Sequence, residues 1–236
     1  MNNFLDGVRK SYDNVAREYA DNIFDELKDK PLDRALLNRF AEAVQPLGVA
    51  VDLGCGPGQI ARYLHERGVN VIGMDLSPNM IALAKQLTPA VDFFQGDMFA
   101  LDVPDGAWGG IAAFYSIVHI PREKMVDALR ELNRVLVPQG VLLLAFHRGD
   151  EIVHRDEMWG KAVNMDFLYF EGREVEAYLR AAGFEILEVS ERAPYPDVEH
   201  PSQRVYIFAR KSASPPGPSP EKILKKFFQE RGSSAW

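Results

Sequence analysis

The stretch Val51-Asp52-Leu53-Gly54-Cys55-Gly56-Pro57-Gly58-Gln59 decides the fold of this chain. It follows a short apolar strand and opens a helical run, and its three glycines stand at alternate positions. Glycines let the backbone approach a ligand without an intervening Cβ, and they permit positive φ angles. The spacing G-x-G-x-G differs from the G-x-G-x-x-G of dinucleotide-binding folds. The stretch therefore predicts a strand–loop–helix turn whose backbone contacts a ligand, with a tight turn of small residues as the plain alternative.

Asp52 stands two residues before the first of these glycines. A carboxylate is unfavourable beside a pyrophosphate, because both are negatively charged. It suits either the cationic end of a ligand or hydrogen bonds to amides of the loop itself. Both interpretations stay open from the sequence.

Strand and helix patterns alternate on both sides of the glycine stretch. Apolar runs predict strands at 49–53, 69–74, 91–95, 111–115, 141–147, 184–189 and 205–209. Helical periodicity predicts helices at 8–27, 31–44, from Ile60 to a stop at Gly68, and at 78–87, 123–137 and 174–182. Ser77 is a natural N-cap, followed by Pro78 in the first helical position. Such alternation predicts a mostly parallel sheet with helices on both faces, whose ligands bind at the carboxyl ends of the strands.

Two further acidic residues follow strands of this predicted sheet. Asp75 ends the second strand, where a carboxylate can accept both hydroxyls of a ribose. Asp97 and Met98 follow the third strand, where they can bind and pack against an adenine. Nicotinamide-dependent proteins share the first feature, and a helix cap or a turn explains either residue taken singly. The three sites in chain order, each after a strand, are a more specific pattern than any one of them.

Composition and charge narrow the function classes. The chain has 236 residues, 47% hydrophobic and 26% charged, which is typical of a globular protein. Its net charge of −7 argues against a nucleic-acid-binding protein. The single cysteine, Cys55, rules out an internal disulfide framework and a multi-cysteine metal site. Without a long apolar window or an apolar leader, we expect a cytoplasmic protein with no membrane association.

Four segments resemble the successive motifs of class I S-adenosylmethionine-dependent methyltransferases of the small-molecule branch. They are VDLGCGPGQ, GMDLSPNM, FQGDMF and LNRVLVPQGVLLLAF, within a resemblance that extends roughly from Tyr12 to Lys211. The resemblance implies S-adenosylmethionine as the cofactor. It also implies an α/β, Rossmann-like, doubly wound sheet of seven strands in the order 3-2-1-4-5-7-6, with the last strand antiparallel. Residues 1–46 would form a helical N-terminal cap and residues 47–211 the core.

The resemblance also implies the residues of the cofactor site. Asp52, Gly54, Gly56 and Gly58 fall around the methionine part of the cofactor, Asp75 on the ribose, and Asp97 with Met98 on the adenine. Tyr12 and Tyr19, in the cap segment SYDNVAREYAD, would close over it, although ordinary helix packing also explains them. The other expected cofactor contacts are Leu76, Met80, Tyr115 and Ser116.

Members of this family line the methyl-transfer site with the exit of the fourth strand, here Phe114 to Pro121. His119 is the best general-base candidate, with Tyr115 as the second catalytic candidate, but His119 also fits a helix cap or a packing role. For the substrate wall we expect Tyr19, His119, Trp159 and Phe170. The aromatic segment from His154 to Phe170 suits an aromatic or heterocyclic acceptor, with ordinary core packing as the alternative.

Several motifs of other chemistries are missing from the sequence. The fourth-strand exit is not the [DN]-P-P-[YF] of amino-methylating nucleic-acid enzymes, and no Pro-Cys nucleophile exists for pyrimidine methylation. His147 and His154 lack a matching third ligand, so we expect hydrogen-bonded polar histidines and no metal site. A small-molecule acceptor is favoured over a nucleic acid.

The last residues form a separate part of the chain. Residues 212–220 predict a Pro/Ser-rich linker, and residues 221–236 an amphipathic helical tail. Residues 232–236 resemble a cloning scar. The tail or the cap can mediate a homodimer.

The sequence therefore predicts an enzyme that transfers a methyl group from S-adenosylmethionine to N, O or S of a small, partly apolar metabolite. One alternative is a binding module that holds the cofactor without turnover. Another is a nicotinamide-dependent reductase, which binding of NADH in place of S-adenosylhomocysteine would identify.

Overall fold

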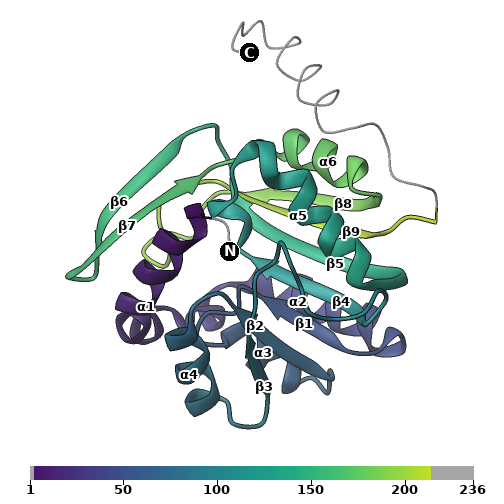
Figure 1. Ribbon diagram of the computed structural model, residues 1–236, viewed down its shortest axis with the longest axis horizontal. Coiled ribbons are helices and arrows are strands. Elements are labelled where there is room, and N and C mark those ends of the chain that lie inside the picture. The colour runs from purple at the N-terminus through teal and green to yellow at the C-terminus, as the bar shows by residue number, and fades with distance from the viewer. Residues whose placement is uncertain (1–2, 214–236) are drawn as a thin grey trace, which may run out of the picture.

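A mixed sheet organises the computed structural model, which describes residues 3–213 (Figure 1). Its order is β3-β2-β1-β4-β5-β9-β8, with β1 to β5 paired in parallel and β9 antiparallel to both of its neighbours. The predicted strand order and the antiparallel last strand are confirmed, because β8 and β9 are the sixth and seventh strands of this sheet. The strands are β1 (Ala50–Leu53), β2 (Val71–Asp75), β3 (Asp92–Gln95), β4 (Trp108–Phe114), β5 (Leu136–His147), β8 (Phe184–Arg192) and β9 (Arg204–Lys211).

Helices cover both faces of the sheet. On one face pack α5 and α6, and on the other α2, α3 and α4, while α1 lies over the carboxyl ends of the strands. The helices are α1 (Asn3–Ile23), α2 (Pro31–Val44), α3 (Gln59–His65), α4 (Pro78–Leu87), α5 (Arg122–Val135) and α6 (Gly172–Ala181), with short 3-10 turns η1 (Glu26–Asp29), η2 (Gln45–Leu47) and η3 (Ile117–His119). No helix within residues 3–213 is both long enough and apolar enough to cross a membrane.

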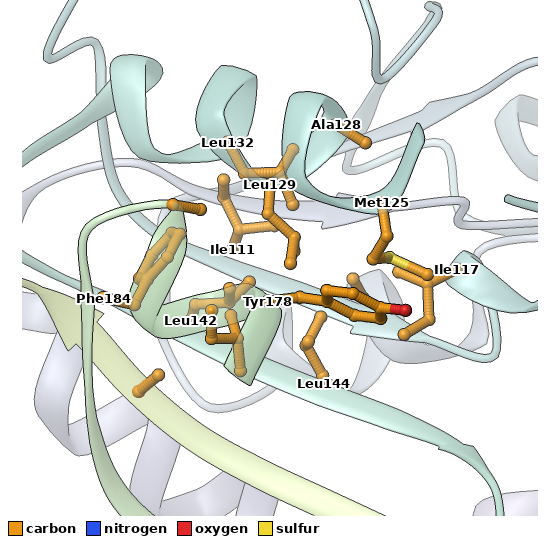
Figure 2. Close-up of a cluster of buried hydrophobic side chains, with 14 of the residues drawn as sticks. Ile111, Ile117, Met125, Ala128, Leu129, Leu132, Leu142, Leu144, Tyr178 and Phe184 are labelled. Atoms are coloured by element: carbon orange, nitrogen blue, oxygen red, sulfur yellow. The ribbon is translucent and has the colours of Figure 1, made fainter. Parts of the chain in front are cut away.

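The core under α5 and α6 is continuous with the middle of the sheet. Figure 2 shows Leu129 of α5 and Tyr178 of α6 packed over Ile111 and Leu142 of the central strands. These side chains are at most 1% exposed. The helical periodicity at 123–137 therefore marks a core-facing stripe, as predicted. This packing fixes the strand ends that line the site.

One predicted boundary differs at the end of α5. The helix stops at Val135 and β5 begins at Leu136, two residues earlier than the expected end of the helix. A residue that precedes a proline is disfavoured in the helical region, and Pro138 follows Val137. The chain therefore becomes extended before the proline.

The first predicted helix, 8–27, is also interrupted. It ends at Ile23, and the 3-10 turn η1 follows. Arg62 of α3 donates hydrogen bonds to the Phe24 carbonyl at 3.0 Å and to the Asp25 carboxylate at 2.9 Å. This tertiary contact fixes the break and turns the chain toward α2.

The predicted cap of α4 is confirmed and has a second function. The Ser77 hydroxyl accepts from the Met80 amide at 3.1 Å, as an N-cap does. It also donates to the Asp13 carboxylate of α1 at 2.6 Å. The start of α4 therefore holds α1 over the ends of the strands.

A two-stranded hairpin, β6 (Ile152–Met158) and β7 (Lys161–Leu168), projects beside α1 (Figure 1). The Ser11 hydroxyl accepts from the Asn164 amide at 2.9 Å, and Asn14 donates to the Ala162 carbonyl at 2.8 Å. This is the segment in which we expected a substrate cover without predicting its form. The cap helix and the hairpin form one joined unit.

The predicted tail lies almost entirely outside the described residues. Residues 214–236 carry most of the expected linker and the whole amphipathic segment. The domain boundaries and a homodimer through the cap or the tail stay predictions.

Candidate cofactor and substrate site

Two adjoining cavities lie at the carboxyl edge of the sheet. One of about 90 Å³, the strand-end cleft, is formed by the ends of β1, β2, β3 and β4 and by α1. The other, of about 530 Å³, is the cap chamber, bounded by α1, the hairpin and the ends of β5 and β9. Both cavities share a wall made of Tyr12, Tyr19, Gly54, Gly56, Phe114 and Tyr115.

Most of the predicted site residues meet in the strand-end cleft. They are Tyr12, Tyr19, Gly54, Gly56, Asp75, Leu76, Met80, Asp97, Met98, Tyr115, Ser116 and His119. Asp52 and Trp159 line the cap chamber instead. Gly58 and Phe170 line neither cavity.

Two glycines of the loop have different functions. At Gly54, φ is +76°, and a Cβ would lie 2.4 Å from the Cβ of Ser116, so the loop touches the end of β4. At Gly58, φ is +90°, and a Cβ would lie 2.8 Å from Phe93 of β3. The missing side chain of Gly58 makes room for the Phe93 ring, and a cofactor contact at Gly58 stays a prediction.

The Asp52 carboxylate is turned into the start of α3. It is 1% exposed and accepts a hydrogen bond from the Ala61 amide at 2.9 Å. Burial raises its pKa to about 8. Of the two interpretations left open by the sequence, the structure favours the one in which Asp52 braces nearby amides.

Asp75 connects the end of β2 to the glycine loop. Its two carboxylate oxygens accept from the Gly56 and Ser77 amides, each at 2.8 Å. Burial raises the pKa of this carboxyl group. Each oxygen of a carboxylate has a second lone pair, so both can still accept from a ligand in the cleft. Asp97 is arranged similarly, with the Phe99 amide donating to it at 2.9 Å.

His119 joins three elements through both of its ring nitrogens. Nδ1 lies 2.7 Å from the carbonyl oxygen of Asp166, and Nε2 lies 2.8 Å from the Tyr12 hydroxyl. Because a carbonyl can only accept, Nδ1 carries the proton and Nε2 accepts from Tyr12. Burial lowers the pKa of His119 to about 4. The ring is therefore neutral at pH 7 and holds Tyr12 in place.

Aromatic rings continue from Tyr12 across the mouth of the site. Tyr19 packs edge-to-face against Tyr12, with centroids 5.9 Å apart, and against Trp159 of the hairpin turn at 5.6 Å. A Cβ on Gly56 would lie 3.6 Å from the Tyr19 ring. The cap therefore closes over the glycine loop, in the arrangement that the resemblance implies.

The expected substrate-wall role of Phe170 is corrected. This residue is fully buried beside Phe146, with ring centroids 6.4 Å apart, and Arg122 stacks over its ring at 4.9 Å. Phe167 lines the chamber instead and packs against His119 at 4.8 Å. Residues three positions apart in an extended segment point to opposite sides, which agrees with Phe167 in the chamber and Phe170 in the core.

An ion network lies behind Tyr115. Arg192 binds Glu199 at 2.6 Å and Asp33 at 2.9 Å, and Lys30 binds Glu199 at 3.2 Å. Glu26, paired with Lys30, and Arg204, paired with Glu199 at 3.8 Å, complete it. Sequence reasoning missed this cluster, because its members come from distant segments and form no motif.

The two histidines that we considered and rejected as metal ligands have polar partners. His147 Nδ1 lies 2.8 Å from the Ser202 hydroxyl, and His154 Nδ1 lies 2.7 Å from the Asp166 carboxylate. The prediction of hydrogen-bonded polar histidines is confirmed. In the part of the chain that the structure describes, no group of three or more His, Cys, Asp or Glu residues is placed to hold a metal ion.

His119→Gln tests the function of the neutral ring. Because the folded-state pKa of His119 lies below its ordinary 6.5, wild-type protein should lose stability as the pH falls from 6.5 toward about 4. The glutamine variant should lose less over the same window, measured by urea unfolding at pH 7 and pH 5. An identical pH dependence in both proteins would contradict the buried neutral ring.

The groups that line both cavities fit S-adenosylmethionine. Its ammonium, ribose hydroxyls and adenine amine are all hydrogen-bond donors. The site offers hydrogen-bond acceptors to them. These acceptors are the carboxylates of Asp75 and Asp97 and two buried oxygens, Ser116 Oγ and Gln59 Oε1. The two buried oxygens have no hydrogen-bond partner within residues 3–213. Buried polar atoms without partners are rare, and a ligand would satisfy them.

Comparisons with known proteins agree with this arrangement. A sequence family described as a methyltransferase domain matches residues 50–140. Malonyl-[acyl-carrier protein] O-methyltransferase of Enterobacter lignolyticus is 32% identical over 135 residues, covering 56% of this chain and 49% of the relative. The chain thus spans about half the length of that curated relative.

Solved structures share the fold over nearly the whole described chain. The DhpI–SAH complex superposes with a TM-score of 0.70 at 22% identity, covering 91% of this chain and 100% of that one. The Burkholderia thailandensis 1,6-didemethyltoxoflavin-N1-methyltransferase, solved with 1,6-didemethyltoxoflavin and S-adenosylhomocysteine, gives 0.68 at 21% identity, covering 89% of each chain. Residues 50–140 thus match a methyltransferase domain, and the solved structures share the fold that the resemblance to class I S-adenosylmethionine-dependent methyltransferases implies.

Proposed function

We propose that this protein transfers a methyl group from S-adenosylmethionine to N, O or S of a small, partly apolar acceptor. One observation carries the proposal. Asp75, Asp97 and Ser116, at the ends of β2, β3 and β4, line a single cleft with the glycine loop that follows β1, and this cleft shares an aromatic wall with a larger chamber. A cofactor in the cleft and an acceptor in the chamber would meet at that wall.

Each end of the cleft suits a different part of the cofactor. The loop at Gly54 and Gly56, with Ser116 beside it, would hold the methionine part. Asp75 would accept from the ribose hydroxyls, and Asp97 with Met98 would bind the adenine. Leu76 and Met80 supply apolar contacts along the same cleft.

The chemistry needs little acid or base assistance from the protein. When bound, S-adenosylmethionine supplies an activated methyl: a lone pair of the acceptor bonds to it as the carbon–sulfur pair returns to sulfur. The residues of the shared wall then have to align the acceptor and exclude water. Tyr12, Tyr19 and Tyr115 surround the point of transfer. Their rings also favour a sulfonium nearby.

His119 and Tyr115 are the candidates for direct participation. In the described arrangement, the Tyr12 hydroxyl occupies His119 Nε2. For His119 to act as a base, Tyr12 would have to release that nitrogen. We therefore assign His119 to positioning and expect His119→Gln to keep turnover within about tenfold, whereas a general base contributes about 100-fold or more.

The relatives differ in the atom that they methylate, and their names support the class only. One is named an O-methyltransferase and another an N1-methyltransferase. The proposal therefore covers N, O and S acceptors alike.

Calorimetric titration with S-adenosylhomocysteine and with NADH tests the cofactor assignment. We expect the first to bind and the second not to bind. Release of S-adenosylhomocysteine with amine, phenol and thiol panels then tests turnover. Binding of NADH only would overturn the proposal, and tight cofactor binding with every panel blank would favour a non-catalytic binding module.

Asp75→Ala tests the ribose contact. Loss of the carboxylate should weaken S-adenosylhomocysteine binding by about 1–3 kcal/mol, because two hydroxyls lose their acceptor and Gly56 loses its brace. Asp92→Ala is the matched control, since Asp92 is exposed at the opposite end of β3. Calorimetry should give unchanged affinity for this control. An unchanged dissociation constant for Asp75→Ala would count against the ribose contact.

A further inference from the structure

We infer that the acceptor carries a negatively charged group of the carboxylate class, which binds in the cap chamber between Arg204 and Arg155. This inference rests on the proposed function, because it names the substrate class of the same site. The charged group is an anchor, and a different atom of the acceptor is methylated.

Arg204 of β9 provides the buried part of this anion site. Its side chain is 3% exposed and lines the chamber. Two of its guanidinium nitrogens donate to Ser202 and to the His200 carbonyl. The third, Nε, has no hydrogen-bond partner within residues 3–213, although it lies 3.8 Å from Glu199 Oε1 in an ion pair. A buried donor without a partner is costly, and an acceptor in the chamber would relieve that cost.

Arg155 provides the exposed part of this anion site. It lies on β6 of the hairpin and lines the chamber. Its guanidinium group lies 3.2 Å from His200 Nε2, and no carboxylate of residues 3–213 forms an ion pair with it. An arginine fork of this kind suits the planar geometry of a carboxylate.

Four acids line the chamber: Glu26 and Glu199 are paired with cations, Asp52 accepts from the Ala61 amide, and the exposed Glu157 accepts from the Gly160 amide at 3.2 Å. Glu199 accepts from Arg192 and from the Tyr195 amide, and it also pairs with Lys30. Although burial opposes it, the hydrogen bonds from Arg192 help to lower the pKa of Glu199 to about 2. Glu26 accepts from Lys30 and Gln59. The unmet hydrogen-bonding capacity at this anion site therefore belongs to donors.

The pKa shifts of the two histidines beside Arg204 indicate the sign of the electrostatic potential there. Burial and the positive charge of Arg204 lower the pKa of His147 to about 3. Burial, then Arg155 and Arg204, also lower the pKa of His200. The contributions of the arginines make an anion more favourable than a cation beside both rings, whereas burial opposes a charge of either sign.

The rest of the chamber suits an apolar, ring-shaped body. Tyr19, Trp159, Phe167 and Tyr169 form its walls. Arg155 and Arg204 line only the chamber and are absent from the wall shared with the strand-end cleft. The Arg204 guanidinium carbon lies 5.8 Å from the centroid of the Tyr115 ring in that wall, so the charged group of the acceptor binds beside the shared wall and not within it.

Matched pairs of acids and amides test this assignment. Benzoate, cinnamate and naphthoate are each titrated against the corresponding primary amide, with and without saturating S-adenosylhomocysteine. We expect at least one acid to bind about tenfold more tightly than its amide. Arg204→Lys should remove most of that preference. The exposed Arg155→Gln, which leaves the buried ion network intact, should reduce it by up to about fivefold.

Glu157→Gln is the control of opposite charge on the same hairpin strand, and it should keep or raise the preference for the acid. Arg180→Gln, on the far helix α6, should leave it unchanged. The inference is overturned if no acid binds more tightly than its amide, or if both arginine variants keep the full preference. Formation of a methyl ester from a bound acid would overturn the anchor role. Because ligand-free protein is titrated too, a failure to bind S-adenosylhomocysteine would count against the proposed function only.

Discussion

Gly54→Ala is expected to weaken S-adenosylhomocysteine binding by about 100-fold or more. The new Cβ would lie 2.4 Å from the Cβ of Ser116, inside any tolerable contact, so the loop must move away from the end of β4. Displacements of about 1 Å in a positioned site cost on the order of 100-fold. Calorimetric titration of the purified variant measures the effect.

Gly68→Ala is the matched control for backbone strain. Its φ of +75° equals that of Gly54 within a degree, yet nothing lies within 4 Å of its added Cβ. An alanine at this φ should cost about 1–2 kcal/mol of stability and leave cofactor affinity unchanged. If Gly54→Ala bound like wild type, the close approach of loop and strand would not matter for binding.

Arg192→Ala is expected to reduce the free energy of unfolding by about 3–5 kcal/mol. Arg192 is the cation that joins Glu199, Asp33 and the Tyr206 hydroxyl, and it is only 10% exposed. Its removal leaves buried carboxylates without their partner, which costs more than the loss of an exposed ion pair. Urea unfolding at pH 7 measures the change.

Arg39→Ala is the control, because Arg39 and its partner Glu188 are 46% and 39% exposed. Its cost should stay below about 1 kcal/mol. The pH dependence adds a second measurement. Since the pKa of Glu199 falls from 4.5 to about 2 in the folded state, its contribution to stability is lost as the pH falls between these values. Equal destabilisation by Arg192→Ala and Arg39→Ala would contradict a structural role for the network.

The part of the site that lies in local sequence was predictable. Gly54 and Asp97 lie within two residues after a strand and Asp75 ends one, so the positions of the strands place all three at one edge of the sheet. The Ser77 cap follows from the same kind of local rule. The fold and the residues of the cofactor site could therefore be predicted from sequence patterns a few residues long.

The acceptor side was not predictable in the same way. Lys30 follows η1, Glu199 lies in the segment between β8 and β9, and Arg204 begins β9, so these residues meet only through tertiary packing. The hairpin was missed because β6 is largely exposed on both faces and shows no clear alternation. Phe170 was misplaced because the segment was treated as one aromatic surface, whereas Phe167 and Tyr169 line the chamber and Phe170 is buried in the core.

A crystal structure with S-adenosylhomocysteine tests the central assignment most directly. We expect the adenine at Asp97 and Met98, the ribose at Asp75, and the methionine part along Gly54 and Gly56, with the sulfur directed at the shared wall of the two cavities. Density for this ligand at another place, or a different nucleotide held by the same strand ends, would contradict the account.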